Sequence, residues 1–143
     1  MKRNGFTFIE LLVVMVVAGL LIGLSIWGYF NSIEAGRLNE DISRFSKFYG
    51  DLKVQLQKDT VLTRYALIFY PGSDSLLVID PVKLTRIASF RFYYSVFSQA
   101  GSSPLFLYKD GTLSNEVNFQ VKYGTHTANL TLTLSGILKK KVE

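Results

Sequence analysis

Histidine and cysteine, the side chains that most often bind transition metals, are almost absent from the 143 residues. The chain has a single histidine, His126, and no cysteine, which excludes multi-histidine zinc sites, thiolate metal sites and a cysteine nucleophile. Asp74, Asp80 and Asp110 are too scattered to form a calcium-binding loop. No Walker A, nucleophile-elbow or paired-carboxylate pattern is present. We therefore predict a protein that is not an enzyme and that binds neither a metal ion nor a cofactor.

Glu10 has an unusual setting for a carboxylate, because it directly precedes a long apolar run. From Leu11 to Ser32 the chain has no charged residue and no proline. Twenty helical residues span about 30 Å, the thickness of the hydrocarbon core of a bilayer, so the run predicts a membrane helix. A carboxylate beside such a helix is costly and often marks a function or a partner. It can equally lie at the headgroup level near Lys2 and Arg3, and the residues alone leave both interpretations open.

Lys2 and Arg3 also predict the topology of the chain. Positive charges before an apolar segment keep that end in the cytoplasm, so we expect the rest of the chain outside the inner membrane. A secretory signal peptide has an apolar region of only about 7–15 residues and ends in a small-residue cleavage site. The run found here is longer, and no such site follows it.

The N-terminal residues form a recognisable processing signal. A basic leader, Lys2-Arg3-Asn4-Gly5, is followed by Phe6, by Glu10 as the fifth residue after Gly5, and by the apolar run. This pattern resembles the class III signal of type IV pilins and pseudopilins. The resemblance implies that a prepilin peptidase cleaves between Gly5 and Phe6 and methylates the new Phe6 amine. It also implies that Glu10 meets the Phe6 amine of a neighbouring subunit during filament assembly.

Two glycines in the apolar run are candidates for helix packing. Gly19 and Gly23 form a G-x-x-x-G pattern, and small residues at this spacing let membrane helices approach closely. Many major pilins carry a proline in this segment, whereas this chain has none. We expect the two glycines to pack against other subunits.

A helical pattern continues beyond the apolar run to about residue 58. Apolar residues at spacings of three and four form one face of an amphipathic helix: Leu38, Ile42, Phe45, Tyr49, Leu52 and Leu56. The polar residues between them are expected to face solvent: Arg37, Asn39, Glu40, Asp41, Arg44, Lys47 and Asp51. The apolar face needs a partner, and we expect a β-sheet to cover it.

From Thr60 the apolar pattern changes to that of β-strands. The sequence predicts a hairpin over 65–80, a strand over 87–97, a turn at Asp110-Gly111 and alternating strands around 117–123 and 130–134. This order predicts the α+β class, with the amphipathic half of one long N-terminal helix packed on an antiparallel sheet. The aromatic residues of 87–97 cannot all face inward, so some are expected to contact another subunit: Phe90, Phe92, Tyr93, Tyr94 and Phe97.

The C-terminal half has a strand ending in Asp110-Gly111, a strand over 117–122 and a strand leading to Gly136. This order resembles H-type pseudopilins and FimT-type minor pilins, and competence pseudopilins of similar length share it. FimT-type chains often end in Gly-Arg-x-Arg, whereas Gly136 is followed here by Ile137-Leu138-Lys139.

Lys139, Lys140 and Lys141 form the only dense charge run after the apolar segment. The formal net charge is +5, and loss of the leader with Lys2 and Arg3 lowers it to +3, the number of these lysines. Three interpretations of the run stay open: a solvated tail, a contact with nucleic-acid phosphates and a contact with anionic lipid.

The predicted organisation has three parts. We expect a leader at 1–5, a transmembrane and filament-core helix at 6–30, and a soluble pilin-like domain at 31–143. Within that domain the helix extends to about 58, the sheet covers about 60–138 and a basic tail follows at 139–143.

The predicted function is that of a pseudopilin or minor pilin, a structural subunit of a type II secretion pseudopilus or a type IV pilus. Its expected partners are other pilins, prepilin peptidase and membrane lipid. Two alternatives stay open. One is a DNA-binding minor pilin or competence pseudopilin that uses the lysine run, and the other is a single-pass membrane anchor with a periplasmic domain.

Overall fold

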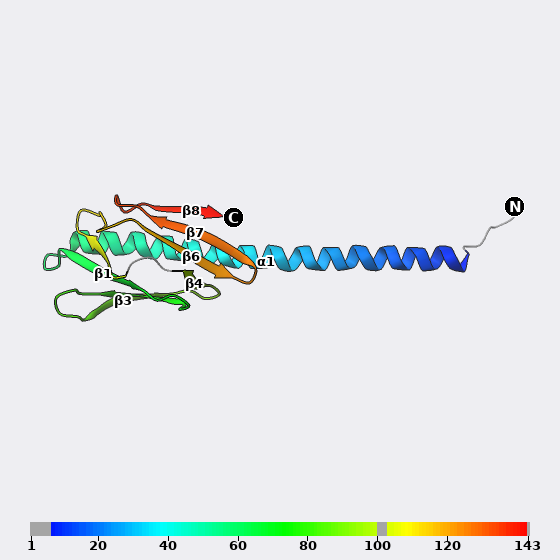
Figure 1. Cartoon of the computed structure of the whole chain (residues 1–143), viewed down its shortest axis with the longest axis horizontal. Coiled ribbons are helices and arrows are strands. Elements are labelled where there is room, and N and C mark those ends of the chain that lie inside the picture. The colour runs from blue at the N-terminus through cyan, green and yellow to red at the C-terminus, as the bar shows by residue number, and fades with distance from the viewer. Residues whose placement is uncertain (1–6, 100–102, 143) are drawn as a thin grey trace. The chain divides into compact units, whose positions relative to one another are not determined.

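The computed structural model of the chain describes residues 7–99 and 103–142. The predicted leader at 1–5 and the predicted cleavage site at Gly5 and Phe6 lie outside these residues. The chain divides into two compact units, Met1–Ile33 and Glu34–Glu143. The helix α1 (Phe8–Lys58) begins in the first unit and continues into the second (Figure 1).

In the first unit α1 is apolar on all sides. An 18-residue window of the helix has a mean hydropathy of 2.7, and none of that window is buried within the chain. Large side chains such as Leu24 and Trp27 are therefore exposed. Among the described residues, α1 is the helix that is long and apolar enough to cross a membrane. Its bounds confirm the one long N-terminal helix that the sequence predicts to end at about residue 58.

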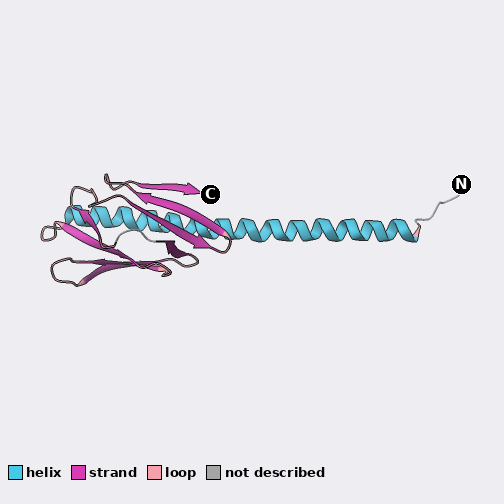
Figure 2. Cartoon of the chain, in the orientation of Figure 1, coloured by secondary structure: helices cyan, strands magenta, loops and turns pink. Residues whose placement is uncertain are grey.

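The second unit combines the later part of α1 with two four-stranded antiparallel sheets (Figure 2). Sheet A has the strand order β3-β2-β1-β5, and sheet B has the order β4-β6-β7-β8. The strands are β1 (Arg64–Phe69), β2 (Ser75–Ile79), β3 (Arg86–Arg91), β4 (Val96–Gln99), β5 (Leu105–Tyr108), β6 (Val117–Tyr123), β7 (His126–Leu132) and β8 (Leu138–Val142). This architecture confirms the predicted α+β class, with two sheets where one was expected.

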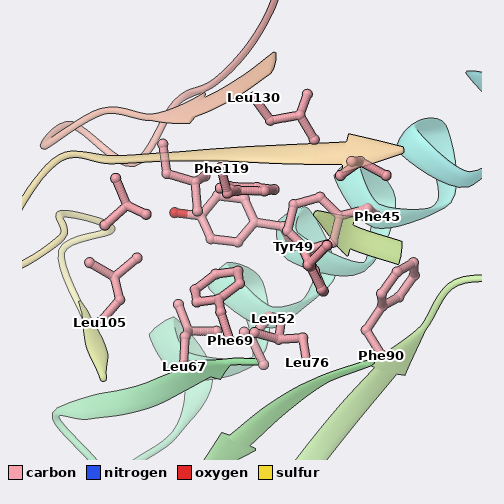
Figure 3. Packing of buried hydrophobic residues seen from close by; sticks show 14 of the residues in the cluster. Phe45, Tyr49, Leu52, Leu67, Phe69, Leu76, Phe90, Leu105, Phe119 and Leu130 are labelled. Carbon is pink, nitrogen blue, oxygen red and sulfur yellow. The ribbon is translucent and has the colours of Figure 1, made fainter. Parts of the chain in front are cut away.

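The predicted apolar face of α1 forms the centre of the core. All six of its members are at most 5% exposed: Leu38, Ile42, Phe45, Tyr49, Leu52 and Leu56. The Phe45 ring centroid lies 5.4 Å from that of Phe90 on β3 and 5.6 Å from that of Phe119 on β6 (Figure 3). Both pairs are edge-to-face, the arrangement that the charge distribution of aromatic rings favours. One helix residue therefore contacts both sheets.

Alternation along the strands of sheet B separates a buried face from an outer face. On β6, Val117, Phe119 and Val121 are buried, and on β7 Leu130 and Leu132 are buried. Successive side chains of a strand point to opposite faces. The intervening residues of β6 and β7 therefore form the outer face of sheet B.

The strand predicted over 87–97 is in fact two strands in different sheets. β3 ends at Arg91 on the edge of sheet A, and β4 begins at Val96 on the edge of sheet B. Both strands are rich in aromatic and β-branched residues, so composition does not reveal the break between them. In the connection between them, residues 93–95 are held by a side chain of α1.

The β-structure also extends beyond its predicted end at about residue 138. β8 pairs antiparallel with β7, and the register starts with Leu132 opposite Leu138. In the turn before β8, Gly136 has a φ of 66°, a backbone conformation that glycine adopts without steric cost. The predicted basic tail is therefore part of a paired strand.

Candidate functional site

Glu10 closes the first turn of α1. The Thr7 backbone N–H and the Thr7 hydroxyl each donate to Glu10 Oε2 at 2.8 Å, and the Glu10 N–H donates to Thr7 Oγ1 at 3.3 Å. This reciprocal arrangement is a capping box, in which the side chains at the N-cap and three residues later satisfy backbone donors of the first turn. None of these three hydrogen bonds involves Glu10 Oε1. The Thr7-x-x-Glu10 spacing is visible in the sequence, although the sequence analysis above did not use it.

The glycines predicted for helix packing have no neighbour within the described chain. A Cβ atom placed on Gly19 or Gly23 would meet nothing within 4 Å. The fold of a single chain therefore gives no packing reason for glycine at either position. Their role in packing between helices stays a prediction, as do the processing roles of Gly5 and Phe6.

Asp41 is completely buried, so its predicted place on the solvent-exposed face of α1 is wrong. Its carboxylate accepts three backbone hydrogen bonds from the link between β3 and β4. Tyr93 N–H donates to Oδ1 at 3.0 Å, and the Tyr94 and Ser95 N–H groups donate to Oδ2 at 2.9 and 2.8 Å. Arg44 Nη1 also lies 3.4 Å from Oδ1. The carboxylate thus fixes the path of the chain from sheet A to sheet B.

A signal for this burial was present in the sequence. Asp41 lies three residues after Leu38 and four residues before Phe45, and residues at these spacings share one face of a helix. Hydrogen-bond donors of a turn can satisfy a carboxylate on such a face. The sequence does not say which turn supplies them.

The link held by Asp41 presents two tyrosines at the surface. Tyr93 is 69% exposed and Tyr94 is 39% exposed. The Arg44 guanidinium carbon lies 3.3 Å from the centroid of the Tyr93 ring, and that of Arg37 lies 5.0 Å from the centroid of the Tyr94 ring. Arg37 Nη1 also donates to the Tyr123 hydroxyl at 2.8 Å, and this hydrogen bond raises the pKa of the Arg37 guanidinium. We refer to Arg37, Arg44, Tyr93, Tyr94 and Tyr123 as the Arg–Tyr cluster.

The aromatic residues around this link divide as the sequence predicts. Phe90, Phe92 and Phe97 are buried in the core, whereas Tyr93 and Tyr94 face outward. Tyrosine and arginine are enriched at the centres of protein–protein interfaces. The Arg–Tyr cluster therefore has the composition of a subunit contact.

The three lysines near the C-terminus do not lie on one face of sheet B. Lys139 and Lys141 lie opposite Thr131 and Asn129 of β7, whereas Lys140 lies opposite the buried Leu130. Alternation along β8 therefore places Lys140 on the other side of sheet B from its two neighbours. The Lys140 ammonium group donates to the side-chain oxygen of Asn39 on α1.

The remaining polar residues do not assemble into a metal site. No group of three or more histidine, cysteine, aspartate or glutamate side chains is placed to hold a metal ion in residues 7–99 and 103–142. His126 is the first residue of β7 and is partly buried. Asp59 and Asp110 stabilise local turns. The Val61 N–H donates to the Asp59 carboxylate, and the Thr112 N–H donates to the Asp110 carboxylate.

Comparison with known proteins matches the N-terminal residues to a family model. Residues 1–26 match the model described as the prokaryotic N-terminal methylation motif. Comparison with curated proteins and with solved structures gives no match. The motif spans the predicted leader, the predicted cleavage site and the first part of α1. It confirms the class III signal predicted from the sequence and supports the assignment of the chain to the type IV pilin and pseudopilin family.

Proposed function

We propose that the chain is a pseudopilin or minor pilin, a non-enzymatic subunit that packs into a type IV-like filament after prepilin peptidase removes its leader. The observation that carries the proposal is the methylation motif at residues 1–26, which includes the first part of the 51-residue helix α1. The first part of that helix is apolar and fully exposed, while the second part is covered by sheets. This division suits a subunit anchored by one part of α1 and folded around the other.

The exposed part of α1 needs lipid or other helices around it. In a bilayer, lipid tails cover the apolar side chains as well as another helix would, so close backbone contact becomes important for association. Gly19 and Gly23 offer open surface for such an approach. A bundle of these helices would then replace lipid as the environment of the apolar segment.

Glu10 can cap its own helix and bind a neighbour at the same time. The capping bonds use Oε2 alone, and we propose that Oε1 accepts a hydrogen bond from the Phe6 ammonium group of an adjacent subunit. Cleavage after Gly5 creates that ammonium group, and methylation preserves its charge. Charge-assisted hydrogen bonds are stronger than neutral ones, and a charged pair avoids the cost of an isolated charge in an apolar environment.

The cleavage itself is tested by mass spectrometry of the chain extracted from membranes of cells that contain prepilin peptidase. We expect an N-terminal peptide that begins with N-methylated Phe6. An intact N-terminus that retains Lys2 and Arg3 would contradict the proposal and favour a single-pass membrane anchor.

Substitution of Glu10 tests the assembly step. We expect Glu10→Gln and Glu10→Ala to insert into membranes normally but to be absent from sheared filaments, because neither side chain can pair with an ammonium group by charge. Thr7→Ala is the matched control, since it removes the capping hydroxyl, worth about 1 kcal/mol, and keeps the carboxylate. Incorporation of Glu10→Gln at the wild-type level would refute the proposed pairing.

A further inference from the structure

The outer face of sheet B is polar and positively charged. The strand register places the following side chains on it: Asn118, Gln120 and Lys122 from β6, Thr127, Asn129 and Thr131 from β7, and Lys139 and Lys141 from β8. Figure 1 shows these three strands side by side. On β6 and β7, the side chains between them point to the core.

The positive charges of this face are not balanced by carboxylates on its own strands. Within the described parts of β4, β6, β7 and β8 there is no aspartate or glutamate, and Glu116 is the acidic residue that directly precedes β6. Lys139 and Lys141 are two residues apart on β8, which corresponds to about 7 Å. Lys122 extends the charge to β6, two strands away.

Amide and hydroxyl groups fill the space between the lysines. Asn118, Gln120, Asn129 and Thr131 line a shallow hollow of about 220 Å³ on this face. The Thr131 hydroxyl donates to Asn118 Oδ1 at 2.6 Å, which turns the amide N–H donors of Asn118 away from Thr131. Lysine ammonium groups together with asparagine, glutamine and threonine side chains are the donors that proteins use to bind phosphate oxygens of nucleic acids.

We propose that this outer face of sheet B binds the phosphodiester backbone of a nucleic acid without reading its sequence. None of the described residues that the register of β6, β7 and β8 places on this face has an aromatic ring on which a base could stack. The contacts available to a nucleic acid are therefore those to its sugar-phosphate backbone. Lysine is depleted at the centres of protein–protein interfaces, which makes a protein partner a poorer fit. The site differs from the lysine run of the sequence, because it includes Lys122 and excludes Lys140.

The proposal does not rest on assembly into filaments, so it is tested on the isolated full-length chain in detergent micelles. The probe is a fluorescent duplex DNA of random sequence, and the readout is anisotropy over a range of salt concentrations. Each neutralised phosphate contributes about −0.9 to the slope of log affinity against log salt. Three lysines therefore predict a slope of roughly −2.7, a loss of affinity of about 40-fold between 50 and 200 mM salt.

Single substitutions locate the site. We expect Lys122→Gln, Lys139→Gln and Lys141→Gln each to make the slope less steep by about one unit. Lys140→Gln is the matched control, because it removes the same charge from the same strand on the opposite side of the sheet. An equal effect of Lys140→Gln, or no binding at 50 mM salt, would overturn the proposal.

Two competitors identify the chemistry that is recognised. Inorganic polyphosphate is expected to displace the duplex, because it presents repeated phosphates without bases. Vesicles that contain phosphatidylglycerol are expected to compete poorly. If the protein bound such vesicles through Lys122, Lys139 and Lys141 but failed to bind duplex DNA, the site would be a lipid contact and the proposal would be wrong.

Discussion

Replacement of Asp41 by alanine would remove one buried carboxylate and leave three backbone N–H groups without their acceptor. A hydrogen bond to a charged group contributes about 1.5–3 kcal/mol, so the three bonds set an upper range of roughly 5–9 kcal/mol. Tyr93 and Tyr94 lie at the surface, where water can replace the acceptor, whereas the Ser95 N–H is buried. We therefore expect a loss of about 3–4 kcal/mol in the free energy of unfolding.

This loss is large enough to measure directly. For a unit of about this size, 1 kcal/mol changes the Tm by roughly 4 °C, so Asp41→Ala is expected to lower the Tm by about 12–16 °C. Near-ultraviolet circular dichroism of the full-length chain in detergent micelles reports the melting of the aromatic core of the second unit. Asp41→Asn keeps one acceptor oxygen and should lose less than Asp41→Ala.

The control and the contrary outcome are both well defined. Glu40→Ala removes an exposed carboxylate from the adjacent position of α1 and should change stability by less than about 0.5 kcal/mol. If Asp41→Ala melted within 2 °C of the wild type, the link between β3 and β4 would hold its shape without the carboxylate. The account of how the chain passes from sheet A to sheet B would then be refuted.

Two further substitutions test the core and the β7–β8 turn. Burial raises the pKa of Tyr49 to about 12, and its hydroxyl has no hydrogen-bond partner in residues 7–99 and 103–142. Above pH 10 the unfolded chain has lost this proton and the native chain retains it, so stability should fall between pH 10 and 12, by up to about 3 kcal/mol. Tyr49→Phe should match the wild type in urea unfolding at pH 7 and lose less at alkaline pH; an identical alkaline loss would contradict this cause. Gly136→Ala would place a Cβ atom 1.9 Å from the Gly111 carbonyl oxygen at a φ of 66° and should cost about 2–4 kcal/mol by thermal melting. Gly50→Ala, in open space on α1, should gain up to about 1 kcal/mol, and equal melting of the two variants would refute the steric argument.

The long helix and its buried face could be predicted from the sequence because both depend on local spacing. The six apolar positions from Leu38 to Leu56 are all buried, as their spacing predicts. The turn at Asp110-Gly111 is also local, and Gly111 has the positive φ that this pair of residues favours. Signals of this kind need no knowledge of distant parts of the chain.

The division into two sheets could not be predicted, because it depends on contacts between distant residues. Asp41 binds the backbone of residues 93–95, which are more than 50 positions away in the sequence. Without that contact, residues 87–97 have the composition of one continuous strand. A one-residue change in the pairing of a strand would also exchange its inner and outer side chains, so the faces of Lys139, Lys140 and Lys141 depended on the register with β7.

The positions of the lysines distinguish two explanations of the positive charge on sheet B. β8 is an edge strand, and lysines on edge strands protect a sheet against pairing with other chains. This explanation accounts for Lys139 and Lys141 without any ligand. It does not account for Lys122, because β6 is paired on both sides, with β4 and with β7. If edge protection is the whole role, Lys122→Gln should leave the salt dependence of DNA affinity unchanged while charge removal on β8 promotes self-association. If the outer face binds phosphates, Lys122→Gln should weaken DNA binding as much as Lys139→Gln and leave the chain monomeric in detergent.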